Sequence, residues 1–243
     1  MRALCTGTAL AFLLPSAQAA TDEIAIPDPL PITVKRADFG REPASRDARH
    51  IADWVVDSRD NLDKVFVIID KIEARVFVFD ADGRIRGSAP ALLGSARGDH
   101  TVPGIGERKL SAVRPEERTT PAGRFVAAIG QSSRGEDVVW VDYDAAVSLH
   151  RVIRTQNRLQ RLSTPTAKDK RVSFGCINVP TAFYNTVVSP AFSGTEGIVY
   201  VLPEIRSVRE VFGSYDVDER STRSDAALSA SARNEPAASS GAR

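Results

Sequence analysis

The sequence predicts a mainly β domain, a compact sandwich or partly closed barrel with one or two short helices and an amphipathic helix before it. Two observations lead to this prediction. β-Branched and aromatic residues gather in short runs, and turns rich in glycine and proline separate those runs. Only 180–188 has a helical pattern in this part of the chain. The expected strands cover 65–69, 75–79, a run from Ile85, 91–93, 124–129, 138–141, 147–152 and 198–202.

A helix is expected before these strands, over 45–62. Ser45 is a favoured N-cap residue, and apolar residues recur after it at spacings of three and four. The proline-rich stretch 20–44 has no such periodicity and is expected to be an extended linker. The buried stripe of the helix should consist of Ala48, Ile51, Ala52, Val55 and Val56.

The first 19 residues are typical of a secretory signal peptide. A positive start at Arg2 precedes an apolar run over 4–14, and small residues lead to an expected cleavage site before Ala20. That run is too short to cross about 30 Å of hydrocarbon, so no integral membrane span is expected once the signal is removed. We therefore expect export, into a periplasm. The near balance of 32 basic and 31 acidic residues gives no general attraction to nucleic acid.

The chain after Pro203 changes character. A short helix is expected over 208–212, whereas 221–243 is dominated by Ser, Ala and Arg and cannot bury enough apolar surface to order itself. The sequence therefore predicts a flexible tail over 205–243.

Cysteine usage draws attention to Cys176. Cys5 would leave with the signal peptide, so the mature chain keeps a single cysteine. Exported proteins usually pair cysteines as disulfides, and a lone thiol is open to oxidation, so Cys176 indicates a function. The alternative is a buried cysteine that acts as a small apolar residue.

The residues around Cys176 favour a reactive thiolate. We expect a strand to enter this segment and a helix to open at Pro180, which would place Cys176 near a helix N-terminus. Unpaired amides and the helix dipole would stabilise a thiolate there. Gly175 lets the backbone turn sharply, and the amides of Gly175 and Cys176 are candidate donors to an oxyanion.

A nucleophilic cysteine needs a base, and the chain has three histidines. His50 falls on the amphipathic helix and is expected to be solvated, and His100 lies in a loop with no other signal. His150 ends a strand-forming run, where a catalytic side chain can emerge from a rigid element. Position alone leaves His150 open between a base and a structural histidine.

His150 is followed by Ser-Phe-Gly-Cys-Ile-Asn at 173–178, and Thr-Pro-Ala-Gly-Arg-Phe stands upstream at 120–125. Together these segments resemble the catalytic domain of the L,D-transpeptidases (YkuD-type), over about 63–204. The resemblance implies a YkuD-like catalytic domain in which Cys176 attacks and His150 accepts its proton. It also implies that the Arg151 backbone carbonyl orients the imidazole.

Four further residues have roles implied by the resemblance. Ser173 would hydrogen-bond near the thiolate or substrate, and Gly175 would supply an oxyanion donor together with Cys176. Asn178 would hold the motif loop or a substrate carboxylate, or would be a plain capping or turn residue. Phe174 stands where the family has a second histidine, so the polarity of the donor site should differ.

The spacer between His150 and Ser173 is longer than usual for the family and strongly basic. It is either a solvated loop or a flap that attracts the carboxylates of peptidoglycan stem peptides. Its charged residues are Arg151, Arg154, Arg158, Arg161, Lys168, Lys170 and Arg171, with one acid, Asp169.

The implied reaction is acyl transfer between peptidoglycan stem peptides through a thioester on Cys176, with no metal or organic cofactor. Acylation by carbapenem-type β-lactams is also implied. The alternatives are hydrolysis of the same stems by a carboxypeptidase or endopeptidase, and a non-catalytic wall-binding domain. A metal site is disfavoured because Cys176 and the histidines lack close ligand spacing.

Overall fold

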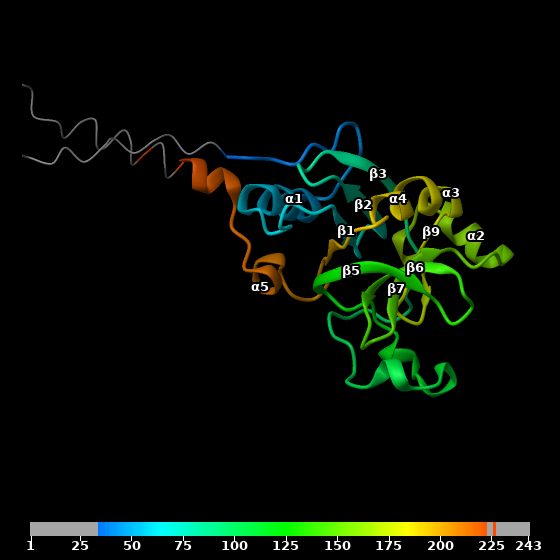
Figure 1. The fold of residues 1–243 in the computed structure, drawn as a ribbon. Coiled ribbons are helices and arrows are strands. Elements are labelled where there is room, and N and C mark those ends of the chain that lie inside the picture. The colour runs from blue at the N-terminus through cyan, green and yellow to red at the C-terminus, as the bar shows by residue number, and fades with distance from the viewer. Residues whose placement is uncertain (1–33, 223–225, 227–243) are drawn as a thin grey trace, which may run out of the picture. The chain divides into compact units, whose positions relative to one another are not determined.

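The structure is a computed structural model that describes residues 34–222 and Ala226 (Figure 1). The predicted signal peptide and most of the predicted linker lie outside the described residues. No helix in 34–222 is long and apolar enough to cross a membrane.

The described chain is built on one eight-stranded sheet, which confirms the predicted mainly β class. The strand order is β3-β2-β1-β10-β5-β6-β7-β9, with β1 parallel to β10, β7 parallel to β9, and antiparallel pairs elsewhere. The strands are β1 (Phe66–Asp70), β2 (Arg75–Phe79), β3 (Ile85–Pro90), β5 (Gly123–Gln131), β6 (Asp137–Asp142), β7 (Val147–Arg151), β9 (Ile177–Val179) and β10 (Gly197–Val201).

The two edges of this sheet come together through the chain that follows β3. Leu92 exchanges both backbone hydrogen bonds with Asn178 of the edge strand β9, at 2.8 and 2.9 Å. Immediately after it, β4 (Leu93–Gly94) pairs in parallel with β8 (Arg171–Ser173). These contacts nearly close the sheet into a barrel, so backbone groups at its edges are paired with protein.

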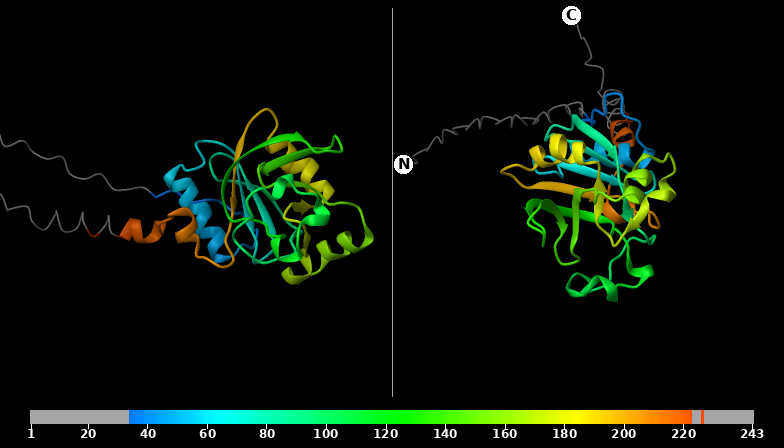
Figure 2. Two further views of the ribbon diagram at one scale, coloured as in Figure 1. Left: turned by 90° about the horizontal axis from the view of Figure 1, so that it is seen from below. Right: turned by 90° about the vertical axis from the view of Figure 1, so that its right-hand side faces the viewer.

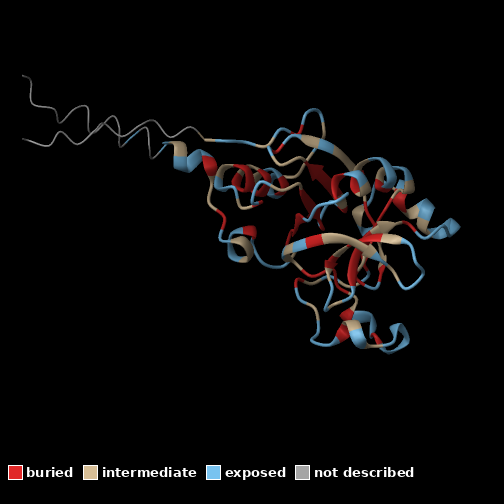
Figure 3. Cartoon of the chain, viewed as in Figure 1, coloured by how far each residue is buried: buried red, intermediate tan, exposed pale blue. Residues whose placement is uncertain are grey.

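Each face of the sheet has its own apolar core. One core gathers inward residues from β1, β2, β6, β7, β9 and β10 around the helical segment that follows β9. The other packs α1 (Arg46–Ser58) against the opposite face of β1, β2 and β10. Figure 2 shows α1 and this later helical segment on opposite sides of the strands, and Figure 3 shows buried residues concentrated between them.

Helix α1 begins where the sequence predicts. The Ser45 hydroxyl accepts a hydrogen bond from the Ala48 amide at 3.1 Å, and Arg59 ends the helix in a left-handed conformation. The five predicted stripe residues are all buried. Part of the expected linker is packed as well, because Phe39 is buried with its ring edge against Phe77 and Phe79.

The segment after β9 is helical, as expected over 180–188. It runs through α3 (Thr181–Phe183), a π-helical turn η5 (Tyr184–Val188) and α4 (Ser189–Ala191). Tyr184 and Val188 are fully buried in the first core, which places this segment inside the curve of the sheet.

The expected tail over 205–243 needs correction at its beginning. Helix α5 (Val208–Phe212) opens with a capping box between Ser207 and Glu210. Val208 and Val217 are buried, and the Tyr215 hydroxyl donates to Asp57 of α1 at 2.7 Å. These apolar and aromatic residues give the start of the segment enough buried surface to pack. Residues 223–225 and 227–243 lie outside the described part.

Candidate active site

Four polar residues share one face of the neighbouring strands β7 and β9. Side chains alternate along a strand, so Leu149, Ile177 and Val179 enter the core while Ser148, His150 and Asn178 face the other way. His150 lies directly opposite Asn178 in the parallel pairing, and Cys176 comes immediately before β9. The fold thus brings Cys176 and His150 together from positions 26 residues apart in sequence.

The His150 imidazole is held by the backbone of its own strand. Its Nδ1 lies 2.7 Å from the carbonyl oxygen of Arg151. Because a carbonyl oxygen only accepts hydrogen bonds, Nδ1 carries the proton and the Nε2 lone pair is directed elsewhere. Nε2 of the neutral ring is therefore able to accept a proton.

The Arg151 side chain fixes the backbone that holds this imidazole. Its guanidinium donates to Asp137 Oδ1 at 2.7 Å and to Asn185 Oδ1 at 2.7 Å, and it stacks 4.2 Å from the centre of the Tyr184 ring. Arg151 also lowers the pKa of Asp137 through this hydrogen bond. An arginine at this position is thus an anchor between β6, β7 and the helical segment.

Residues next to the Cys176 thiol favour its ionised form. Burial raises the pKa of Cys176, but hydrogen bonding and charge interaction with His150, together with hydrogen bonds from Ser148, outweigh it and lower the pKa below its ordinary value. Ser148 Oγ lies 3.7 Å from Sγ, and Sγ lies 3.5 Å from the Ala146 carbonyl oxygen.

The expected contribution of a helix N-terminus to this thiolate is wrong. Strand β9 (Ile177–Val179) separates Cys176 from α3, which starts only at Thr181. Three strand residues span about 10 Å, beyond the first turn over which a helix dipole acts. Interactions with His150 and Ser148 lower the pKa of the thiol instead.

Asn178 is oriented by a residue of the basic spacer. Arg158 Nη1 donates to Asn178 Oδ1 at 2.6 Å, so the amide nitrogen faces the other way. There it donates to the Cys176 carbonyl at 3.2 Å and lies 3.4 Å from His150 Nε2. Asn178 is buried inside β9 and joins the histidine to the cysteine loop; it is not a helix cap.

The Thr120 hydroxyl group holds the turn before Cys176 in place. Thr120 Oγ1 donates to the Gly175 carbonyl at 2.8 Å and accepts from the Gly94 amide at 2.9 Å. Gly175 has φ +137°, and a Cβ there would lie 2.8 Å from the Thr119 carbonyl oxygen, so only glycine fits. The Thr-Pro segment of the sequence thereby braces the cysteine turn.

Ser173 and Gly175 have contacts that differ from those expected. The Ser173 hydroxyl is buried, donates to the Cys176 carbonyl at 2.7 Å and accepts from the Gly175 amide at 3.1 Å. The Gly175 amide is therefore engaged inside the turn and is not aimed at an oxyanion in this structure. The Ser173 hydroxyl thus holds the turn, and its expected hydrogen bond near the thiolate or substrate stays a prediction.

Phe174 projects from the turn and is 38% exposed. Arg118 lies over its ring, 4.2 Å from the centre, and is held in turn by the Val113 carbonyl. Arg118 belongs to the long connection between β4 and β5, which carries three short helices, η1 (Ile105–Glu107), η2 (Leu110–Ala112) and η3 (Pro115–Glu117).

The basic spacer is folded, contrary to the expectation of a loop or flap. It forms α2 (Gln156–Ser163), capped by Thr155, and η4 (Ala167–Lys170). Leu162 is buried against Leu92 and Val152, which fastens α2 to the sheet. The sequence analysis missed this helix because its mean hydropathy is low and Leu162 is its single buried leucine.

The other histidines lie away from the pair. His50 sits on α1 with Nε2 2.9 Å from Ser214 Oγ, and burial lowers its pKa. His100 is exposed in the loop after β4. Among the described residues, no group of three His, Cys, Asp or Glu side chains is arranged to hold a metal ion.

The fold and the site together define a mainly β domain in which a histidine on one strand lies beside a cysteine that immediately precedes the adjacent parallel strand. A scan against protein-family models gives no match, and a search of curated proteins gives no significant match.

Solved structures with a similar fold include a mutant of the helical cell shape determining protein Pgp2 from Campylobacter jejuni, at 14% identity and TM-score 0.42, covering 76% of this chain and 64% of that one. An L,D-transpeptidase from Xylanimonas cellulosilytica matches at 17% identity and TM-score 0.36, covering 57% and 60%. Another L,D-transpeptidase, solved with imipenem, matches at 18% identity and TM-score 0.32, covering 57% and 58%. This chain spans less than two thirds of each.

Proposed function

We propose that this chain is an exported cysteine acyltransferase of the L,D-transpeptidase type, acting on peptidoglycan stem peptides in a periplasm. The observation that carries the proposal is the interaction between Cys176 and His150, which lowers the pKa of the thiol while the Arg151 carbonyl fixes the imidazole tautomer. The predicted signal peptide supports export, and the motifs at 120–125 and 173–178 support the substrate class.

In the proposed first step, Cys176 attacks the carbonyl carbon of the amide that joins the third residue of a stem to its terminal D-alanine. The C–S bond forms and the C–N bond breaks. D-Alanine leaves with the proton that His150 Nε2 took from the thiol. Since the Gly175 amide is bound to Ser173, the Cys176 amide is the oxyanion donor in this proposal.

In the second step an amine of another stem attacks the thioester and forms a cross-link. Water as the acceptor would give a trimmed stem instead. Correct orientation of the two partners can contribute about 7–11 kcal/mol relative to free encounter in solution. No step of this sequence uses a metal or an organic cofactor.

The test is incubation of the purified protein with a disaccharide-tetrapeptide and mass analysis of the products. Wild type is expected to give dimers joined through the third residue, and Cys176→Ala is expected to give none. If only trimmed monomers form, the reaction is hydrolysis and not transfer. If neither wild type nor Cys176→Ala forms any product, the result supports a non-catalytic wall-binding domain.

A further inference from the structure

Lys71 is a fully buried lysine that no step of the proposed reaction uses. It directly follows β1, and its side chain has no exposed surface. Its Nζ donates to the Gly98 carbonyl at 2.6 Å, to the Thr120 carbonyl at 2.9 Å and to Asp99 Oδ1 at 3.0 Å. A lysine ammonium group has three N–H donors, so these three acceptors use its whole hydrogen-bonding capacity. The contacts therefore fit the charged form of Lys71.

Stability alone does not require an ammonium group at this position. Burial lowers the pKa of Lys71, and the hydrogen bond and charge of Asp99 oppose that shift. A buried ion pair often stabilises a fold no more than apolar side chains of the same volume, because both charges lose their hydration. What the ammonium group adds is direction, since it fixes three oxygen atoms around one point.

These oxygen atoms belong to the two ends of the long connection between β4 and β5. Gly98 and Asp99 lie near its start, and Thr120 lies near its end. The Ala122 amide donates to the Asp99 carbonyl at 3.0 Å, which joins the two ends beside the ammonium group. We call these joined ends, 98–99 and 120–122, the base of the connection. Lys71 holds this base together from the interior of the protein.

The turn before Cys176 packs on the same base. Thr120 Oγ1 donates to the Gly175 carbonyl at 2.8 Å. The backbone approach is close, because a Cβ at Gly175 would lie 2.8 Å from the Thr119 carbonyl oxygen. Two hydrogen bonds through Thr120 therefore link the Lys71 ammonium group to the residue before Cys176.

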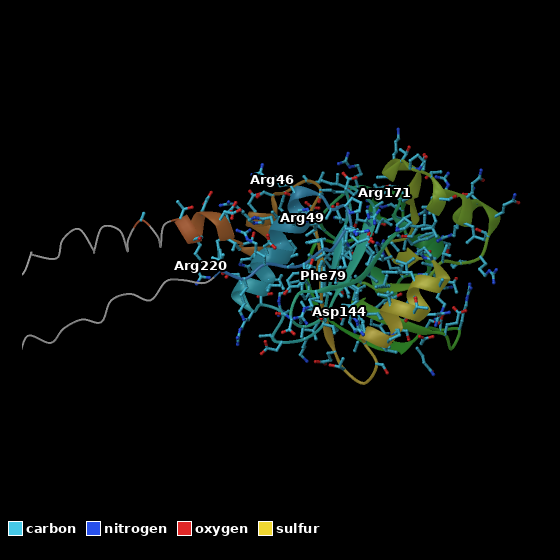
Figure 4. The ribbon with its side chains drawn as sticks, turned by 90° about the horizontal axis from the view of Figure 1, so that it is seen from above. Arg46, Arg49, Phe79, Asp144, Arg171 and Arg220 are labelled. Carbon is cyan, nitrogen blue, oxygen red and sulfur yellow. The ribbon has the colours of Figure 1, made fainter. Side chains whose placement is uncertain are left out.

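The charges around Lys71 form a cluster of their own. Glu204, whose side chain is buried, lies 3.9 Å from Lys71 Nζ and accepts from Arg171 at 2.5 Å. The Glu204 amide donates to Asp99 at 2.8 Å. Figure 4 shows Arg171 well apart from Arg220. The cluster is therefore separate from the charges of the C-terminal segment that carries Arg220.

We propose that Lys71 is a positioning residue for the nucleophile, which holds the base of the β4–β5 connection and, through Thr120, keeps Cys176 within reach of His150. The inference rests on the proposed function for its effect on acylation, whereas its effect on the thiol is measurable without a substrate. If the base relaxes, Cys176 moves relative to His150, and the interaction that lowers the thiol pKa weakens.

The test compares Lys71→Met/Asp99→Asn with Asp99→Asn alone. The double variant removes both charges of the ion pair, so that neither is left buried without the other. Asp99→Asn should keep the hydrogen bond from Lys71 to the Thr120 carbonyl. The matched control is Lys64→Met/Glu196→Gln, which removes a lysine–glutamate ion pair of 3.1 Å at the other end of β1.

Two rates are followed by intact mass, the alkylation of Cys176 by iodoacetamide against pH and its acylation by a carbapenem-type β-lactam. In Lys71→Met/Asp99→Asn we expect the inflection of the alkylation profile to lie about 0.5 pH unit above that of Asp99→Asn. Acylation should be about tenfold slower than in Asp99→Asn, because small displacements of a nucleophile are costly. Asp99→Asn should stay close to wild type, and the control should leave both rates unchanged.

A double-mutant cycle tests the route through Thr120. Adding Thr120→Val to Lys71→Met/Asp99→Asn should slow acylation by no more than about a further twofold, since both changes release the same contact to the cysteine turn. Losses that multiply would overturn the action of Lys71 through Thr120.

A purely structural role predicts a different result. Equal alkylation profiles and acylation rates in Lys71→Met/Asp99→Asn and Asp99→Asn, with only the unfolding free energy lowered, would overturn the inference. If the double variant does not fold, Lys71→Gln/Asp99→Asn takes its place, because glutamine keeps a polar group but is one atom shorter than lysine. Loss of folding in both would also overturn the inference, since Lys71 would then be needed for the fold itself.

Failure of the proposed function is distinguishable from failure of this inference. If the β-lactam does not acylate wild type, the proposed reaction is wrong, and the alkylation profiles still test Lys71 because iodoacetamide needs no substrate site. If wild type is acylated and the variants do not differ, the proposed function stands and the positioning role of Lys71 is wrong.

Discussion

The imidazole Nδ1 of His150 lies 2.7 Å from the carbonyl oxygen of Arg151, the next residue on the same strand. The contact needs no second side chain, so the tautomer of the proposed base is set by the geometry of β7 itself. Its other nitrogen is then free to face Cys176 and Asn178. This arrangement explains how a base is oriented without a carboxylate partner.

The pH dependence of Cys176 reactivity follows from this pair. The thiolate is the reactive form, so the alkylation rate rises as pH increases through the pKa of the thiol. His150 lowers that pKa, whereas burial raises it, so His150→Ala should move the inflection to higher pH than in wild type. The measurement is the rate of alkylation by iodoacetamide against pH, followed by mass. His100→Ala, in an exposed loop, is the control and should leave the profile unchanged.

Arg158 is expected to act as a positioning residue through Asn178. Without its guanidinium the Asn178 amide loses the contact that fixes its orientation, and the hydrogen bond to the Cys176 carbonyl weakens. We expect Arg158→Ala to slow acylation about tenfold, the kinetic equivalent of about 1.4 kcal/mol. Arg158→Lys should restore part of the rate. Arg154→Ala removes an exposed arginine of the same spacer, and an equal loss in that variant would show a general effect of charge.

Thr120 is expected to contribute to stability as well as to the cysteine turn. Thr120→Val keeps the shape but leaves the buried Gly94 amide and Gly175 carbonyl without their partner. The expected cost is about 1–3 kcal/mol of unfolding free energy. Thr120→Ser retains the hydroxyl and should recover most of it. Chemical denaturation measures both, and equal stability of the valine variant would contradict the bracing role.

Acid should weaken the fold through Asp99. Burial raises the pKa of this carboxyl, but hydrogen bonds from the Arg206 and Glu204 amides and from Lys71 outweigh it and lower the pKa to about 2. A carboxyl whose folded pKa is depressed stabilises the protein above its unfolded pKa. That contribution, about 2 kcal/mol, is lost as pH falls from about 4 to about 2.

The measurement is the unfolding free energy against pH for wild type and Asp99→Asn. The variant is expected to be less stable at neutral pH and to show a flatter decline in acid. Asp63→Asn, at an exposed residue, should follow wild type. A decline in Asp99→Asn as steep as in wild type would mean that other groups carry the acid sensitivity.

Periodicity predicted much of the fold. The β-branched runs at 65–69 and 75–79 became β1 and β2, and the stripe with Ser45 as its cap became α1. Sequence could not reveal α2, because one buried leucine gives no periodic signal. The same holds for the closure of the sheet, since the exchange between Leu92 and Asn178 joins segments 86 residues apart and depends on backbone groups that every residue carries.

The site was predictable in its residues and less so in their contacts. Cys176 and His150 lie together, whereas the helix N-terminus expected beside the thiol is replaced by strand β9. Ser148, two residues before His150 on β7, shares its face by simple alternation, and that signal was present in the sequence. The Ala146 carbonyl and the Arg158 contact had no such signal, because they depend on how a turn and a separate helix pack.

The most direct measurement is the intact mass of the protein after incubation with a carbapenem-type β-lactam at neutral pH. Wild type should gain the mass of one molecule of the compound at Cys176. His150→Ala should do so at least about tenfold more slowly, and Cys176→Ala not at all. An unmodified wild-type protein, or modification as fast in His150→Ala as in wild type, would contradict the activated thiol on which the proposed function depends.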